Sequence, residues 1–323
     1  MIHTSLCDLF RIEIPIIQAG MAVFTSAELA AAVSNAGGLG SLGATFRTGA
    51  GFRTQLERTR ELTNRSFAIN FIMQPNLPNE EAFAIALAAR PRVMAFALGD
   101  PGDYVKRAHD AGILVMHMVT TRKQAEQAVA RKVDAIVAQG SEAGGFGGIV
   151  SSLALIPQVV DVAGPIPVLA AGGIADGRGF AAALMLGAQG INIGTRFLAS
   201  VEAPISAEWK KAILTAKSED TLQFDIWPAV FPPRAGGYPV IPRVLSSPFI
   251  RQWENRHDDA QRDAQHLQDQ ISAAIAAGKL GELFPFAGQT VGLIDEILPA
   301  AEITRKIVAE AEEVMRRMMK SLV

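Results

Sequence analysis

The sequence predicts an α/β fold, a (β/α)8 barrel with an insertion after the eighth strand, and three observations support this prediction. Eight short apolar runs recur before residue 200, and their starts lie roughly 25 residues apart, close to the repeat unit of such a barrel. The runs are nearly continuous in apolar residues, as expected for strands that are covered on both faces. Helix-length stretches with capping signals separate them.

The predicted strands share a β-rich composition, and most of them end at or beside a glycine. In chain order they are Ile14–Met21, Gly38–Ala44, Phe67–Met73, Val93–Leu98, Ile113–Val119, Ala135–Gly140, Pro167–Gly173 and Gly190–Leu198.

The stretches between these strands begin with residues that favour helix N-termini. Thr25 and Glu28 have the spacing of a capping box with Thr25 as the N-cap, and Gly37 follows the apolar run as a stop signal. Regular alternation of strands and helices favours a parallel sheet that closes into a barrel. Two further N-caps are predicted, Thr121 before Arg122–Arg131 and Asp176 before Phe180–Leu186.

The composition changes after the eighth strand. A proline-rich extended piece, Trp227–Pro248, is followed by a polar helix, Asp258–Ala277. We expect residues 201–285 to form an insertion that covers the barrel mouth, while residues 1–200 and 286–323 form the barrel. The last segment, Gln289–Met319, has helical spacing of apolar residues and is expected to complete the outer ring.

Composition excludes several classes of protein. The 323 residues contain 30 Lys+Arg and 32 Asp+Glu, and a net charge of −2 gives no electrostatic footprint for nucleic acid. A single cysteine, Cys7, excludes internal disulfides and cysteine-based metal clusters, and no histidine pair has metal-ligand spacing. No apolar run approaches a membrane span and the N-terminus lacks a targeting pattern, so we expect a soluble cytoplasmic protein without membrane partners.

One glycine motif formally matches a dinucleotide fingerprint. Gly38–Gly43 reads G-x-G-x-x-G, but that fingerprint must follow a strand and open a helix. Here a helical run, Ala27–Asn35, precedes the motif, so we reject a Rossmann interpretation.

The ends of strands 7 and 8 point to a phosphate site. Strand 7 ends with Gly172 and Gly173, and strand 8 ends with Gly194 and Thr195. Phosphate commonly binds after these two strands of a barrel, because glycines let backbone N–H groups approach an anion closely. Tight turns alone could also require these glycines, but two such ends on adjacent strands favour phosphate binding.

Three other strand ends suit a flat ligand. Strand 1 ends in Ala19, Gly20 and Met21, and strand 3 carries the amide of Asn70. Strand 6 runs through Gln139 into a stretch with five glycines up to residue 148. A phosphate site, a flat apolar floor and these amides together suit flavin mononucleotide (FMN).

Several ordered motifs resemble the nitronate monooxygenase family, formerly called 2-nitropropane dioxygenases, over nearly the whole chain. The same resemblance extends to flavin-dependent enoyl reductases of fatty-acid synthesis and to NADH:quinone reductases. The motifs are Gln18–Met21, Ser34–Gly40, Ala138–Gly145, Ala171–Ala175, Gly194–Phe197 and Phe286–Gln289.

This resemblance implies a barrel with non-covalent FMN and a flavin-dependent monooxygenase activity on a small molecule. Met118 falls where relatives often carry a polar or cationic residue near the flavin. The implied contacts are Ala19, Gly20 and Met21 to the isoalloxazine, Asn70 and Gln139 to ring or ribityl atoms, Gly144 and Gly145 to the ribityl chain, and Gly172, Gly173, Gly194 and Thr195 to the phosphate.

One position departs from the family pattern. The family continues Glu-Ala-Gly-Gly with a histidine that serves as the base or orients substrate, whereas this chain has Phe146. Phenylalanine cannot take the α-proton of a neutral nitroalkane, although a nitronate is already deprotonated. His117 is a weaker catalytic candidate, because strand alternation lets only one of His117 and Met118 face the site.

Three hypotheses follow. The first is an FMN oxidoreductase that oxidises a nitronate, or a similar stabilised carbanion, with O₂ as acceptor. The second is an NAD(P)H-dependent enoyl-thioester or quinone reductase, in which Phe146 shapes an apolar substrate pocket. The third is an FMN-binding barrel that has lost catalysis. The sequence leaves the oligomeric state open, and a homodimer is compatible with it.

Overall fold

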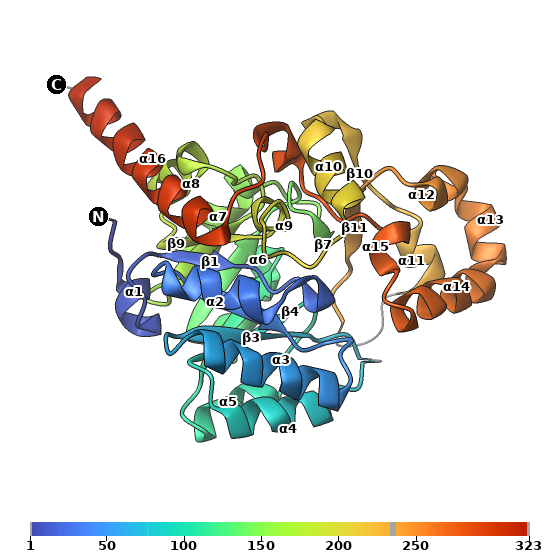
Figure 1. Cartoon of the computed structure of the whole chain (residues 1–323), viewed down its shortest axis with the longest axis horizontal. Coiled ribbons are helices and arrows are strands. Elements are labelled where there is room, and N and C mark those ends of the chain that lie inside the picture. Colours follow the sequence, from blue (N-terminus) through green and yellow to red (C-terminus); the bar gives the residue numbers. More distant parts are fainter. Residues whose placement is uncertain (1, 76, 233–236, 322–323) are drawn as a thin grey trace.

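The computed structural model describes residues 2–75, 77–232 and 237–321, and it confirms the predicted (β/α)8 barrel. Eight parallel strands form one sheet with helices around it (Figure 1). The strands are β1 (Ile16–Gln18), β2 (Gly40–Gly43), β3 (Phe67–Ile72), β4 (Val93–Ala97), β5 (Leu114–Val119), β6 (Ala135–Gln139), β8 (Val168–Ala171) and β9 (Gly190–Ile193).

The sheet runs in the order β1-β9-β8-β6-β5-β4-β3-β2, and an isolated bridge between Ile17 and Leu39 links its two ends. The N–H of Gln18 donates to the carbonyl of Leu39, and the N–H of Leu39 donates to the carbonyl of Ile16, both over 2.9 Å. The side-chain oxygen of Gln18 also accepts from the N–H of Ser41 over 2.8 Å. These hydrogen bonds join β1 to the start of β2 and so nearly close the barrel.

The predicted N-caps are confirmed at two helices and wrong at a third. The side chain of Thr121 accepts from the amide of Gln124, and that of Asp176 accepts from the amide of Gly179. For the helix after β1 the cap is Ser26, not Thr25, because the Thr25 hydroxyl accepts from the N–H of Gly43 on β2 instead. The barrel helices are α2 (Ala27–Asn35), α3 (Gly49–Leu62), α4 (Glu80–Ala89), α5 (Tyr104–Asp110), α6 (Arg122–Ala130), α7 (Ser152–Ala163), α8 (Gly177–Met185), α9 (Thr195–Leu198) and α16 (Ala300–Ser321).

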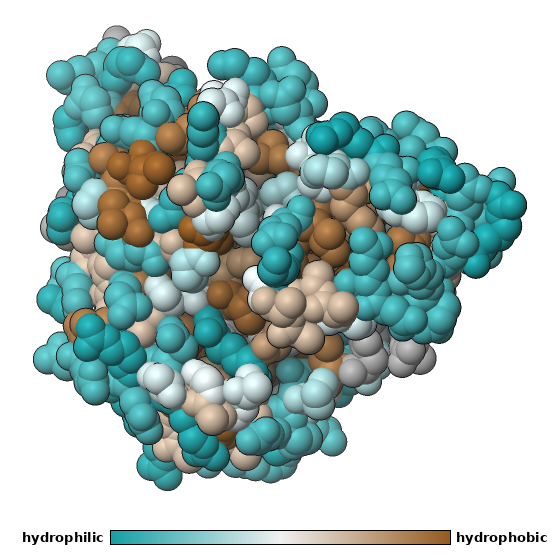
Figure 2. All heavy atoms as spheres, turned by 45° about the vertical axis from the view of Figure 1, so that its right-hand side comes forward, coloured by the Kyte–Doolittle hydropathy of each residue, from teal (hydrophilic) through white to brown (hydrophobic). Residues whose placement is uncertain are grey.

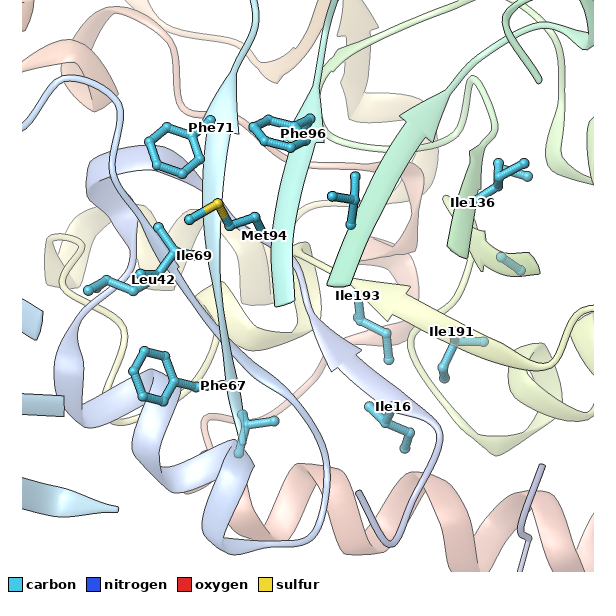
Figure 3. Packing of buried hydrophobic residues seen from close by; sticks show 14 of the residues in the cluster. Ile16, Leu42, Phe67, Ile69, Phe71, Met94, Phe96, Ile136, Ile191 and Ile193 are labelled. Carbon is cyan, nitrogen blue, oxygen red and sulfur yellow. The ribbon is translucent and has the colours of Figure 1, made fainter. Parts of the chain in front are cut away.

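Hydrophobic residues fill both sides of the barrel wall. Alternate strand residues such as Ile69, Phe96 and Ile136 pack outward against the helices (Figure 3). The intervening residues fill the barrel interior, where helix α1 (Ser5–Phe10) adds Leu6 and Phe10 beside the first residues of the strands. This packing covers the N-terminal end of the barrel, so the site is expected at the opposite end.

The rejected dinucleotide motif is a packing motif of the barrel. A side chain at Gly40 would lie 1.8 Å from the carbonyl oxygen of Ala30 on α2, and one at Gly43 would lie 2.2 Å from the carbonyl oxygen of Ala22. The backbone at Ala22 and Ala30 therefore lies too close to β2 for any residue other than glycine at positions 40 and 43.

Residues 201–285 contain more regular structure than the sequence indicated. The piece expected to be extended, Trp227–Pro248, contains a helix and a strand, and its residues 233–236 lie outside the described part. The polar helix expected over Asp258–Ala277 is two helices, separated at Asp263, which has φ −95° and ψ 14°. The elements of the segment are α10 (Ala207–Thr215), β10 (Thr221–Gln223), α11 (Trp227–Val230), β11 (Ile241–Leu245), α12 (Pro248–Trp253), α13 (His257–Arg262), α14 (Ala264–Ala276) and α15 (Leu280–Leu283).

The final helix begins later than expected. The spacing of apolar residues predicts a helix from Gln289, but Gln289–Leu293 is a short 3₁₀ turn and α16 starts at Ala300. Pro299 explains the difference, since a residue before proline is held away from helical geometry. No helix in the described ranges is long and apolar enough to span a membrane.

Two connections attach the 201–285 segment to the carboxyl end of the barrel. Strand β7 (Gly145–Gly147), which follows β6, pairs antiparallel with β11, so that Gly145 lies opposite Arg243. Tyr238 provides the second connection: its N–H donates to the carbonyl of Leu98 over 3.2 Å, and its hydroxyl lies 3.0 Å from Nε2 of His117.

His117 is buried and neutral in this connection. Its Nδ1 lies 3.1 Å from the carbonyl oxygen of Phe96, which can only accept, so Nδ1 carries the proton and Nε2 accepts from the Tyr238 hydroxyl. Burial lowers the pKa of His117 from 6.5 to about 4, although the Phe96 carbonyl and the charge of Asp100 act in the opposite direction. The ring therefore stays uncharged at neutral pH.

The lowered pKa of His117 predicts an acid-sensitive stability. Between pH 6.5 and about 4 the unfolded chain binds a proton at this histidine that the folded chain does not, so the free energy of unfolding falls as pH falls through that window. Replacing it with a group that does not titrate, His117→Gln, should remove about 3 kcal/mol of the decline. Denaturant unfolding at pH 7 and pH 4.5 measures this, and equal declines in both proteins would contradict the assignment.

Candidate functional site

A cavity of about 170 Å³, the inner cavity, lies at the carboxyl end of the barrel. Every residue predicted to contact the cofactor lines it, and so does Phe146, whereas His117 does not. The predicted residues that the structure brings together here are Ala19, Gly20, Met21, Asn70, Met118, Gln139, Gly144, Gly145, Gly172, Gly173, Gly194 and Thr195.

The end of β1 passes directly over the end of β3. A side chain at Gly20 would lie 2.1 Å from Cβ of Asn70, so only glycine lets the two strand ends approach this closely. The result is a wall of bare backbone beside a buried amide, with Met21 and Met118 nearby as flexible apolar surface.

Two buried amide oxygens in this wall have no hydrogen-bond partner among the described residues. They are Oδ1 of Asn70 and Oδ1 of Asn192, and both residues line the inner cavity. The side-chain nitrogen of Asn70 donates to the carbonyl of Ala95 over 3.4 Å, so its oxygen remains to accept from a ligand. An unpaired buried acceptor costs roughly 1–3 kcal/mol, which favours a ligand with N–H or O–H donors at this place.

Asn192 was not singled out from the sequence, although a signal was present. It lies one residue before Ile193 on β9, and the isoleucines on either side of it pack outward against the helices. Alternation along the strand therefore placed Asn192 on the same face as Gly194.

A cradle of backbone amides lies at the ends of β8 and β9. Gly172 and Gly173 have φ of +90° and +75°, a conformation that other residues rarely adopt. In the described part of the chain the N–H groups of Gly172, Gly173 and Gly194 donate to no backbone carbonyl. The Thr195 hydroxyl accepts from the N–H of Gly288 over 2.9 Å, so its own proton can donate. Such a set of donors suits an anion such as phosphate.

Among the described residues, the one carboxylate that lines the inner cavity is already engaged. Glu142 accepts from the N–H of Ser152 over 2.9 and 3.0 Å and from its hydroxyl over 2.9 Å. Among the described residues that line the cavity there is no histidine, lysine or arginine. The arrangement therefore offers no evident general base beside a bound substrate.

Phe146 is fixed from both sides. Its carbonyl oxygen accepts from the side chain of Gln139 over 2.8 Å, and β7 holds it in register with Pro242 on β11. Its ring packs against Trp227 and Phe286, with ring centroids 4.7 and 5.5 Å apart. Phe146, which the sequence predicts to stand where the family pattern has a histidine, is therefore part of an aromatic wall. Neither Trp227 nor Phe286 was predicted as a site residue: the 201–285 segment was expected to cover the barrel mouth, but no pattern in it indicated which side chain meets the site.

A second and larger cavity, the outer cavity, has a volume of about 470 Å³. It lies between the barrel mouth and the 201–285 segment, and Figure 2 shows hydrophobic atoms in the recess beside the right-hand lobe. Five of the residues that the structure describes line both cavities: Phe46, Ile72, Leu98, Phe146 and Leu280.

Known proteins with a similar sequence or fold support a single family. A model of the nitronate monooxygenase family matches residues 3–310. A probable nitronate monooxygenase of Staphylococcus saprophyticus is 31% identical over 98% of this chain and 99% of its own.

Two solved structures agree with this. FabK from Thermotoga maritima is 33% identical with a TM-score of 0.89, and the match covers 99% of this chain and 100% of FabK. The nitroalkane oxidase of Streptomyces ansochromogenes is 29% identical with a TM-score of 0.83 over 98% of this chain and 100% of its own. The chain belongs to the nitronate monooxygenase family, a family of flavin-dependent oxidoreductases.

Proposed function

We propose that the chain is an FMN-dependent oxidoreductase whose site works without a side-chain base, and that it reduces an uncharged apolar acceptor with electrons from NAD(P)H. The observation that carries the proposal is Phe146, which closes the site with an aromatic wall at the position of the family's histidine. The 201–285 segment is the cover of the barrel mouth in this proposal.

The inner cavity suits FMN in two respects. The amide cradle of Gly172, Gly173 and Gly194 suits a phosphate. The unpaired oxygens of Asn70 and Asn192 suit the N–H and hydroxyl donors of a flavin. When bound, FMN would accept an electron pair from one substrate and pass it to a second.

The residues of the chain would orient both reactants and exclude water. Backbone at Ala19 and Gly20 and the side chain of Met21 would lie against the flavin ring, and Gly144 and Gly145 would lie along its ribityl chain. Phe146, Trp227 and Phe286 would press an apolar acceptor toward the ring. A quinone fits such a site well, because its oxygens can take protons from water, whereas protonation of an enoyl carbon requires a placed acid.

Oxidation of a nitronate with O₂ is the second candidate. Family membership favours it, and a nitronate is already deprotonated and therefore needs no base. Against it stands the anionic charge of a nitronate, which would meet no cation among the described residues that line the inner cavity. If neither substrate class reacts with the flavin, the third hypothesis, an FMN-binding barrel that has lost catalysis, is supported instead.

An anaerobic titration of the purified protein separates these functions. We expect NADH or NADPH to bleach the flavin absorbance and an alkyl-substituted quinone to restore it. Bleaching by a nitronate but by neither nicotinamide would support the second candidate and overturn the first.

The phosphate cradle can be tested with a matched pair of variants. Gly194→Asp places a negative charge among the donors, whereas Gly194→Asn has nearly the same size without the charge, and a side chain there has room beside Met21 at 3.6 Å. We expect the aspartate variant to bind FMN at least tenfold more weakly than the asparagine variant. The two variants should bind riboflavin, which lacks the phosphate, equally well. An equal effect on both ligands would show that the phosphate lies elsewhere.

The absence of a base predicts how the site treats a neutral nitroalkane. Nitroethane should not bleach the flavin absorbance of the wild-type protein, whereas it should bleach that of Phe146→His. The rate of bleaching in this variant should rise with pH, because the new imidazole loses its proton and can act as a base. Phe146→Leu serves as the control, because it opens the same space without a base. Bleaching of the wild type as fast as the histidine variant would reveal another base in the site.

A further inference from the structure

We propose that the outer cavity binds an uncharged apolar chain of the substrate, while the reacting end of the same molecule lies in the inner cavity. This assignment rests on the proposed reduction of an apolar acceptor, and it names the part of the acceptor that the chain recognises.

The first argument is continuity between the two cavities. Phe46, Ile72, Leu98, Phe146 and Leu280 line both, so a ligand can extend from one into the other beside the Phe146 ring. The outer cavity, at about 470 Å³, lies within the range of roughly 300–1,000 Å³ that is typical of sites for drug-sized ligands. A substrate of only a few carbon atoms would leave it largely unused.

The second argument is the chemistry of the lining. Trp227 and Phe231 stack with their ring centroids 4.4 Å apart and form one wall. Helix α14 contributes Ile271 and Ile275 to the same apolar lining. Burial of an alkyl chain against such surface is worth about 0.8 kcal/mol per methylene, so affinity should rise with chain length.

The third argument concerns charge. The described residues that line the outer cavity include no lysine, arginine or histidine, and their one carboxylate is Asp269. An anionic chain would be desolvated here without a partner, which costs several kcal/mol. The amide nitrogens of Gln74 and Gln268 already donate to the carbonyls of Leu98 and Val230. Their oxygens remain to accept from a hydroxyl or amide of an uncharged ligand.

Two neighbouring residues on α14 give a matched test. Ser272 lines the outer cavity and Ala273 does not, and both side chains are exposed, so tryptophan at either position leaves the core of the protein intact. Ser272→Trp should fill part of the cavity, and Ala273→Trp adds the same ring outside it. A tryptophan ring at position 272 could turn toward solvent and leave the cavity open. Ile275→Trp is therefore a second cavity-filling variant, because Ile275 is a half-buried lining residue.

The affinity of the purified protein, with its cofactor bound, is measured by calorimetry for three simple probes. The probes are 1-decanol, 1-butanol and decanoate. We expect wild type and Ala273→Trp to bind decanol at least tenfold more tightly than butanol or decanoate. Ser272→Trp and Ile275→Trp should lose most of this preference while they unfold at the wild-type temperature. Equal binding of decanol and decanoate, or unchanged decanol binding in both cavity-filling variants, would overturn the proposal.

This binding test needs no turnover, so it fails or succeeds separately from the proposed reductase activity. With 2-alkyl-1,4-benzoquinones, KM should fall as the alkyl chain lengthens in Ala273→Trp but not in Ser272→Trp. A KM that is independent of chain length in Ala273→Trp would show that the chain of a turning-over substrate lies elsewhere.

Discussion

The antiparallel pairing of β7 with β11 is the contact on which the rest of the site depends. Strand β7 is the glycine-rich continuation of a barrel strand, and β11 belongs to the 201–285 segment. The buried side chain of Arg243, opposite Gly145, donates to the carbonyl of Ser141, ahead of β7, and to that of Thr221 on β10, and so ties the loop after β6 to the strands of the 201–285 segment. Without this contact the aromatic wall at Phe146 would have no fixed place between the two cavities.

The electrostatics of the site follow from the same arrangement. Two ionisable side chains near the barrel mouth are engaged with other residues: Glu142 accepts from Ser152, and His117 accepts from Tyr238. The other polar groups that line the inner cavity in the described part of the chain are backbone amides, amide side chains and threonine hydroxyls, which select a ligand by its donors and acceptors. Such a site can bind and orient a flavin and an uncharged acceptor, and it leaves proton transfer to water.

Much of the fold could be predicted from the sequence because the barrel repeats one local pattern. The places of the eight strands and the caps at Thr121 and Asp176 were predicted correctly, since they depend on neighbouring residues only. The predicted eighth strand, Gly190–Leu198, was too long, because Thr195–Leu198 forms helix α9. The cap at Thr25 was wrong because its hydroxyl bonds to Gly43, a contact between elements that no local pattern encodes. The same reason explains why Trp227, whose ring meets Phe146, was not anticipated.

A crystal structure of the protein with bound FMN tests the central claim most directly. We expect the phosphate among the amides of Gly172, Gly173 and Gly194, flavin donors at the oxygens of Asn70 or Asn192, and the Phe146 ring between the flavin and the outer cavity. A phosphate bound outside the amide cradle, or a histidine, lysine or arginine side chain within hydrogen-bond reach of the substrate position, would contradict the account of a site without a base.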